Sequence, residues 1–286
     1  MSQIQFVGGK FQAVINGKMV KRSHESDLKA LIKKAQSFVA PVPTTPSKYD
    51  INKRFDFVEK LVKMVAGEVQ PSAIITGRGG LGKSYTVTKT LEAQGYKDIS
   101  DLEEFVIVPG KKVFRVVKGY STAKGLYRTL YENSNGVIVF DDTDAILRDP
   151  VALNLLKAAL DSYSKRYITW NAENMNDDLP SSFEFKGRVI FISNMDQTKI
   201  DQAIRSRSIM IDLSMTTDEI ISRMEYIVKS KEFMPDTSIR FKTDAIEFLR
   251  EKKDSAKELS LRTLISVVKI RSANTDWKEM ADYVLS

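Results

Sequence analysis

The segment Gly77-Arg78-Gly79-Gly80-Leu81-Gly82-Lys83-Ser84 constrains this chain of 286 residues more than any other feature, because it matches the pattern GxxxxGK[ST]. The apolar run Ala73–Thr76 before it predicts a strand, and Tyr85–Ala93 after it predicts a helix. Glycines let the backbone curl until successive amides face one anion, and the start of the helix adds partial positive charge. The sequence therefore predicts a loop that binds the phosphates of a nucleotide.

The residues of this loop have separate roles in that prediction. Lys83 would reach the β- and γ-phosphates, and Ser84 would be a ligand of Mg²⁺. The remaining positions expected around the nucleotide are Gly77, Gly79, Gly80, Leu81, Gly82 and Tyr85.

A second apolar run, Val137–Phe140, ends in the acids Asp141 and Asp142. Open parallel sheets bind ligands at the carboxyl ends of their strands, so we expect these carboxylates beside the glycine-rich loop. Asp141 would hold Mg²⁺ through water, and Asp142 would accept a proton from an attacking water molecule. The alternative is that the two acids only cap the helix that follows.

Short apolar runs alternate with helical patterns from residue 51 to about residue 215. This alternation predicts an α/β fold, with a parallel five-stranded sheet covered by helices on both faces. Residues 216–286 show amphipathic helical patterns and no strand pattern, so we expect a C-terminal helical lid. The predicted strands are Ala73–Thr76, Val113–Val117, Val137–Asp141, Val189–Ser193 and Ile209–Leu213.

Residues 1–39 predict a small ββα-like module. Phe11–Ile15 and Met19–Lys21 flank Asn16-Gly17, which is a strong hairpin signal. Residues 40–50 form a proline-rich linker, which is typical of an extended and semi-rigid connection. The helix of the module is predicted from apolar residues at helical spacing, namely Leu28, Leu31, Ile32, Ala35 and Phe38.

The charge of the chain is concentrated in that module. The formal net charge is +7, and residues 1–48 hold eight basic and two acidic residues. A basic arm of this kind favours nucleic acid or an acidic partner. The alternative is a docking or oligomerisation module with a solvated basic face.

The composition excludes several kinds of chemistry. Without cysteine the chain has no disulfides, thiol nucleophiles or cysteine metal sites. Its single histidine, His24, argues against a histidine-based metal site and a serine–histidine catalytic triad. Carboxylates, lysine, arginine, hydroxyls and amides remain, which are the groups that phosphoryl transfer uses. No apolar run approaches the roughly 18 residues that cross a bilayer, and the first residues lack a signal-peptide pattern. We therefore expect a cytoplasmic protein without a membrane partner.

These two motifs and three later segments resemble the AAA+ ATPases over about residues 51–275. Val189–Asn194 is similar to the sensor-1 strand, whose final polar residue, here Asn194, positions water. Residues 200–207 are similar to the segment that carries an arginine finger, for which Arg207 is the better match and Arg205 the second. Residues 258–264 are similar to the sensor-2 segment, where Arg262 would contact the nucleotide in the same chain.

The resemblance implies ATP and Mg²⁺ as cofactors and a homo-oligomer, either a hexameric ring or an open spiral. It also implies that Arg207 reaches the γ-phosphate of a neighbouring subunit. Many AAA+ proteins have glutamate where this chain has Asp142, and the shorter side chain places the base farther from the water unless the backbone shifts. Either hydrolysis is slow, or Asp142 is used as it is in relatives with two aspartates. The Asp-Asp pair and Ser193-Asn194 also resemble viral superfamily 3 helicases, which would place the protein in the cytoplasm of a host cell.

Two further segments are similar to elements that line the pore of ring ATPases. Tyr167–Trp170 and Ser182–Phe185 predict a hairpin, with Arg166 and Trp170 as candidates to contact substrate. The alternative is that this segment only covers an edge of the sheet. Lys118 and Tyr120 follow a predicted strand where a pore loop would emerge, although the aromatic ring could equally belong to the core.

The sequence therefore predicts an ATPase motor that acts on nucleic acid as a DNA-dependent ATPase, helicase or loader. Two alternatives remain open at this point. One is a chaperone-like ATPase that remodels a protein client, and the other is a switch whose nucleotide state controls assembly.

Overall fold

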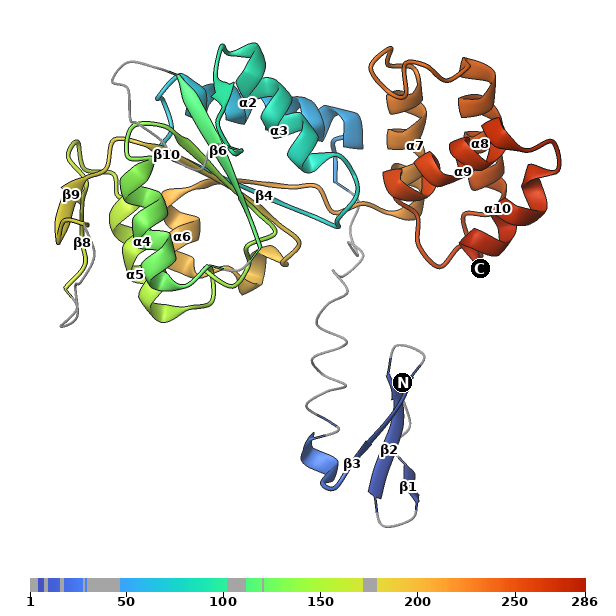
Figure 1. Cartoon of the computed structure of the whole chain (residues 1–286), viewed down its shortest axis with the longest axis horizontal. Coiled ribbons are helices and arrows are strands. Elements are labelled where there is room, and N and C mark those ends of the chain that lie inside the picture. The colour runs from blue at the N-terminus through green and yellow to red at the C-terminus, as the bar shows by residue number, and fades with distance from the viewer. Residues whose placement is uncertain are drawn as a thin grey trace. The chain divides into compact units, whose positions relative to one another are not determined.

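A computed structural model of the chain describes residues 5–7, 10–15, 18–27, 29, 47–101, 112–119, 121–171 and 179–286. The chain divides into two compact units, Met1–Pro41 and Val42–Ser286, and Figure 1 shows the elements of each. No helix in the described part of the chain is long and apolar enough to cross a membrane.

The first unit contains a three-stranded antiparallel sheet in the order β1-β2-β3, formed by β1 (Gln5–Val7), β2 (Lys10–Ile15) and β3 (Lys18–Arg22). Ile15 pairs with Lys18, which confirms the predicted hairpin, although Asn16 and Gly17 lie outside the described residues. The sequence pattern did not indicate β1. Residues 25–27 and 29 are helical, and the apolar positions predicted for this helix lie outside the described residues, as does linker segment 40–46.

The second unit is built on a six-stranded parallel sheet in the order β11-β4-β10-β7-β6-β5. The prediction of five strands was one too few. The sixth strand, β5, consists of two residues that are both exposed, so it is too short to form a recognisable apolar run. The strands are β4 (Ser72–Thr76), β5 (Lys97–Asp98), β6 (Val113–Lys118), β7 (Val137–Asp141), β10 (Arg188–Ser193) and β11 (Ile209–Asp212).

Helices cover both faces of this sheet, as Figure 1 shows. One face carries α2 (Ile51–Ala66) and α3 (Lys83–Ala93), which pack on Ile75, Val139 and Ile190. The other face packs through Ile74, Phe140 and Phe191 against α4 (Ala123–Glu132), α5 (Pro150–Ala159) and α6 (Gln202–Arg207). Successive strand residues thus enter opposite cores, as expected for a sheet buried on both faces. A short 3-10 helix, η1 (Gln197–Lys199), precedes α6.

Between α5 and β10 the chain forms the predicted hairpin. Strand β8 (Tyr167–Thr169) pairs antiparallel with β9 (Ser182–Glu184), so that Tyr167 lies opposite Glu184. Residues 172–178 between the two strands lie outside the described residues.

Residues 216–286 form a helical domain without strands, as predicted, composed of α7 (Thr217–Val228), α8 (Ile239–Glu251), α9 (Leu261–Ala273) and α10 (Trp277–Leu285). A capping box of Thr216 and Glu219 begins α7, which satisfies amide groups that the helix leaves unpaired. The buried Arg54 of α2 ties this domain to the sheet. Its guanidinium donates to the carbonyl of Ser214 at 2.7 Å and forms an ion pair with Glu219.

Candidate functional site

The predicted site residues meet at the carboxyl ends of three adjacent strands. Strand β10 lies between β4 and β7, and its register places Ser193 beside Thr76 and Ile192 beside Asp141. The glycine-rich loop leaves β4, Asn194 follows β10, and Asp142 follows β7. The order of the strands therefore puts Asn194 between the loop and the acids, although it is far from both in sequence.

Residues 77–82 curl between β4 and α3 because their glycines adopt conformations that other residues rarely take. Gly77, Gly80 and Gly82 have φ angles of +134°, +72° and +93°. A Cβ atom on Gly77 would lie 2.8 Å from the carbonyl carbon of Leu213, so no larger residue fits there. Within the described part of the chain, no group accepts a hydrogen bond from the backbone amides of residues 79–82. A curl of unpaired amides at the start of a helix is a geometry that suits an anion.

Lys83 begins α3 and is buried, with 5% of its surface exposed. Its ammonium group donates to the carbonyls of Gly77 and Arg78 and, at 2.9 Å, to Oδ1 of Asn194. Burial lowers the pKa of Lys83 to about 8, and the nearby Asp142 and Asp141 carboxylates oppose that shift. An anion bound at the loop would therefore stabilise the charged form of Lys83.

Ser84 and Asp141 form a hydroxyl–carboxylate pair beside Lys83. The hydroxyl of Ser84 donates to Oδ1 of Asp141 at 2.9 Å, and Oδ2 of Asp141 lies 3.6 Å from the ammonium of Lys118. Among the described residues, no group of three or more His, Cys, Asp or Glu is arranged to hold a metal ion. A divalent cation here would therefore depend on Ser84, Asp141 and oxygens of water or ligand, which is how Mg²⁺ is commonly held with phosphates.

Asp142 lies at a strained position. Its φ angle is +55°, in the left-handed region that non-glycine residues seldom occupy, and its backbone amide donates to the carbonyl of Ile192. Its Oδ1 accepts a 2.7 Å hydrogen bond from the side-chain amide of Asn194. Partial desolvation and the neighbouring Asp141 carboxylate raise the pKa of Asp142, while Lys83 and Arg262 oppose the rise.

Two polar contacts next to these groups were not anticipated from the sequence. The hydroxyl of Ser193 donates to Asp144 at 2.6 Å, and Thr76 donates to Asp212 at 3.0 Å. The signal for Asp144 was present, because it follows the acidic pair by two residues. Both acids lie close enough to Lys83 to favour its charged form.

The helical domain reaches the same loop through the start of α9. The backbone amide of Leu261 donates to the carbonyl of Gly80 at 2.8 Å, and the N-cap of α9, Ser260, lies against Gly80. Arg262 is exposed, lies next to Gly80 and favours the charged form of Asp142. The predicted sensor-2 residue is therefore beside the loop and the acids. Tyr85, by contrast, directs its hydroxyl to Glu232 after α7.

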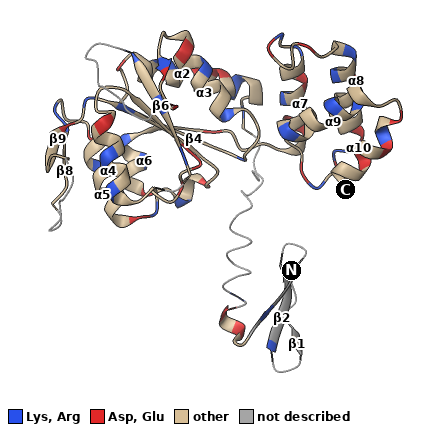
Figure 2. Cartoon of the chain, viewed as in Figure 1, with Lys and Arg blue, Asp and Glu red and all other residues tan. Residues whose placement is uncertain are grey.

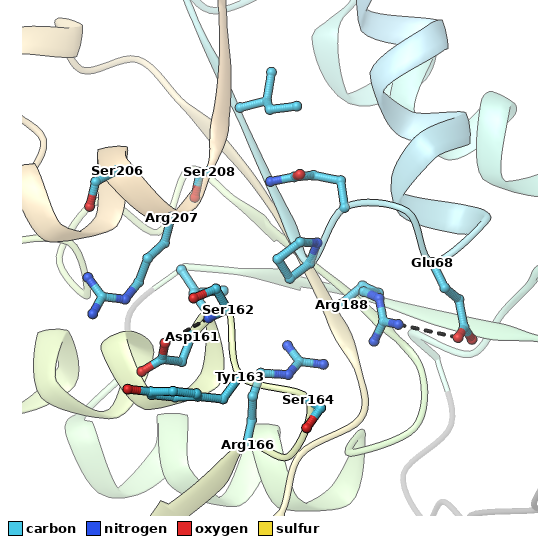
Figure 3. A pocket seen from close by; sticks show the side chains of 14 residues that line it. Glu68, Asp161, Ser162, Tyr163, Ser164, Arg166, Arg188, Ser206, Arg207 and Ser208 are labelled. Carbon is cyan, nitrogen blue, oxygen red and sulfur yellow. Dashed lines mark hydrogen bonds and ion pairs between the residues drawn. The ribbon is translucent and has the colours of Figure 1, made fainter.

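The two predicted finger arginines lie away from these groups. Arg207 ends α6, and its carbonyl accepts a hydrogen bond from Ser72, the first residue of β4, whereas the glycine-rich loop follows the last residue of that strand. Arg207 and the loop therefore lie at opposite ends of β4, whose length is roughly 13 Å. Arg207 lines a cavity of about 770 Å³ together with Arg166 and Arg188. Figure 3 shows these three side chains around it. Arg205 is exposed on the same helix.

The four residues predicted to contact a substrate have different surroundings. Tyr120 lies outside the described residues, and Lys118 points to Asp141. Arg166 is buried and donates to the carbonyls of Ala159 and Gly187 at 2.6 and 2.8 Å. The ring of Trp170 packs 5.9 Å from that of Tyr127. Arg166 and Trp170 thus stabilise the fold around the hairpin. A substrate contact by either stays a prediction, which burial disfavours for Arg166, whereas Trp170 is partly exposed.

One known protein is similar to the chain over most of its length. It is the protein named as an uncharacterized 36.7 kDa protein in the nrdC-mobD intergenic region of Enterobacteria phage T4. The two sequences are 30% identical over 250 residues, which cover 81% of this chain and 73% of the phage protein. No protein-family model matches the chain.

Proposed function

We infer that this chain, which belongs to the same family as the 36.7 kDa protein of phage T4, is a Mg²⁺-dependent ATPase of the AAA+ type. One observation carries the proposal. Lys83, Asn194 and Asp142 form a connected row of hydrogen bonds beside a loop of unpaired amides, at the edge of the sheet where parallel folds bind ligands.

The phosphates would be bound by groups that already lie together around the glycine-rich loop. The amides of residues 79–82 would donate to phosphate oxygens, and the start of α3 would add its partial positive charge. Lys83 would exchange its bonds to backbone carbonyls for bonds to the β- and γ-phosphates. Because burial strengthens electrostatic interactions, this exchange favours a highly charged ligand over a neutral one.

The metal and the water would be held by the acids on the far side of Asn194. Ser84 and Asp141 offer the oxygen ligands that Mg²⁺ prefers, and Mg²⁺ would neutralise charge on the phosphates. Asp142 would accept the proton of the attacking water, and its raised pKa makes it a better base than an ordinary aspartate. Asn194, which bonds Asp142, would hold that carboxylate and the water in line.

Arg207 would act on a neighbouring subunit. It lies at the edge of the sheet opposite its own loop, so it cannot reach a nucleotide bound by the same chain. Its Nε is buried without a partner among the described residues. We therefore propose a homo-oligomer, a hexameric ring or an open spiral, in which Arg207 completes the next site. Arg262 would contact the nucleotide within its own chain.

We propose nucleic acid as the substrate of this motor. The support is the charge of the chain, because the basic excess lies in residues 1–48, whereas basic and acidic side chains are interspersed over the second unit, as Figure 2 shows. A locally basic segment neutralises phosphates.

The test of the function is release of phosphate from ATP, measured with Mg²⁺ and with EDTA. The test of the substrate is the same rate with single-stranded DNA, duplex DNA or RNA added at low and high salt. Stimulation that fades with salt supports the nucleic-acid motor. Metal-dependent hydrolysis whose rate changes with none of the three nucleic acids favours a protein client or an assembly switch. If the chain neither hydrolyses ATP nor binds nucleotide, the ATPase proposal is contradicted.

A further inference from the structure

Lys118 has a defined place at the metal end of the site. It is the last residue of β6, and the parallel register puts it opposite Asp141, the last residue of β7. Its Nζ lies 3.6 Å from Oδ2 of Asp141, whose Oδ1 accepts the Ser84 hydroxyl. The lysine side chain is 70% exposed and that of Asp141 is 7% exposed. A buried carboxylate is thus shared between a hydroxyl and a solvent-facing cation.

Lys83, the other cation near Asp141, is engaged elsewhere. Among the described residues, its ammonium group donates to Gly77, Arg78 and Asn194. Within the described part of the chain, Lys118 is the single residue that forms an ion pair with Asp141. Because a buried charge is costly unless it is paired, this contact stabilises the acid in the absence of another cation.

We propose that Lys118 is the counter-ion of Asp141 while no divalent cation is bound, and that a divalent cation at Ser84 and Asp141 displaces it. The proposal rests on the proposed function, which takes those two residues as the metal site. The lysine and the metal carry charge of the same sign and would face the same carboxylate, so they compete for it. Lys118 can move aside because its side chain lies mostly in solvent, and the loss of its contact with Asp141 opposes metal binding.

The chain around Lys118 has room for this displacement. Gly119, which follows it, has a φ of +88°, and no atom of the described residues lies within 4 Å of the position that a Cβ would take. Lys118 therefore regulates how tightly the site holds metal. That Lys118 contacts a substrate stays a prediction beside this role.

The experiment measures binding of Mn²⁺, as a paramagnetic substitute for Mg²⁺, to the full chain without nucleotide by electron paramagnetic resonance. Lys118→Met is expected to bind Mn²⁺ about tenfold more tightly than the wild type, the effect of removing a unit charge roughly 6 Å from a doubly charged ion in water. Lys118→Arg should restore the wild-type affinity. Lys165→Met, which removes an exposed lysine before the β8–β9 hairpin, is the matched control and should change nothing.

Equal affinity of Lys118→Met and the wild type would overturn the proposal, as would a failure of every variant to bind Mn²⁺. A gain in affinity that persists when Asp141→Asn is added would also overturn it, because the ion would then lie elsewhere. Circular dichroism confirms that each variant is folded. Binding of a fluorescent ADP analogue tests the proposed function separately: a wild type that binds Mn²⁺ in competition with Lys118 but binds no nucleotide would remove the ATPase and leave this inference standing.

Discussion

The side-chain amide of Asn194 donates to the carboxylate of Asp142 at 2.7 Å, while its oxygen accepts from the ammonium of Lys83 at 2.9 Å. One side chain thus connects the proposed phosphate-binding lysine to the proposed base. Asn194→Ala should lower kcat by roughly 10²-fold, the usual range for losing an oriented proton-transfer group, with little change in ATP affinity. Steady-state kinetics and nucleotide titration measure both quantities. Asn274→Ala, at the exposed end of α9, is the control, and an unchanged kcat in Asn194→Ala would contradict its role.

Removal of the Lys83 charge should affect binding itself. Lys83→Met is expected to abolish hydrolysis and to weaken binding of ADP by roughly 10- to 100-fold, because a hydrogen bond to a charged group contributes about 1.5–3 kcal/mol. Lys89→Met, on the exposed side of the same helix and paired with Glu92, should behave as the wild type. Both constants follow from titration with a fluorescent ADP analogue. Equal affinity in the two variants would place the phosphates elsewhere.

The role of Arg207 in a neighbouring site can be tested by mixing subunits. Arg207→Ala should bind ATP normally and hydrolyse it about 10³-fold more slowly, at the lower end for arginine fingers. Lys83→Met should also be inactive, but a mixture of the two variants should regain activity, since some interfaces combine an intact loop with an intact arginine. Arg205→Ala is the control on the same helix. If Arg205→Ala is the inactive variant, the finger is Arg205, and a mixture that stays inactive argues against action between subunits.

The pH dependence of nucleotide binding should follow Lys83. Its pKa is about 8 in the folded chain, so the charged form prevails below that pH and is lost above it. Because phosphates bind the charged form, affinity should be full below about pH 8 and fall as the pH rises further, approaching tenfold per pH unit. Titrations across this range measure the slope, and calorimetry in buffers of different ionisation enthalpy should detect proton uptake near pH 8. Constant affinity and no proton uptake would show that another group binds the phosphates.

Much of the fold was predictable because its signals are local. The apolar runs of β4, β7 and β10 are buried along their whole length or nearly so, and such strands read directly as short apolar segments. Strand β5 was missed because its two residues are exposed, and its pairing with β6 depends on neighbours rather than on its own sequence. Strand β1 was missed for a related reason, since its three residues pair with β2 without a pattern of their own.

The sequence predicted which residues would meet at the carboxyl ends of the strands, but not how they contact one another. The motif around Lys83 and the acids after β7 specify residue types, whereas the contact of Lys83 with Asn194 depends on β10 lying between β4 and β7. Strand order is a property of the whole sheet, so no local pattern encodes it. Arg166 shows the same limit, because the sequence beside the hairpin does not reveal that its guanidinium donates to the carbonyls of Ala159 and Gly187.

The left-handed backbone of Asp142 explains why an aspartate, and not a longer side chain, suits this position. Aspartate and asparagine enter this conformation more readily than longer side chains, which pay for it in strain of order 1 kcal/mol or more. Asp142→Glu would therefore displace the carboxylate from its contact with Asn194 and would also add backbone strain at the turn. The aspartate and the turn are suited to each other, so the proposed base at this position is not simply a shortened glutamate.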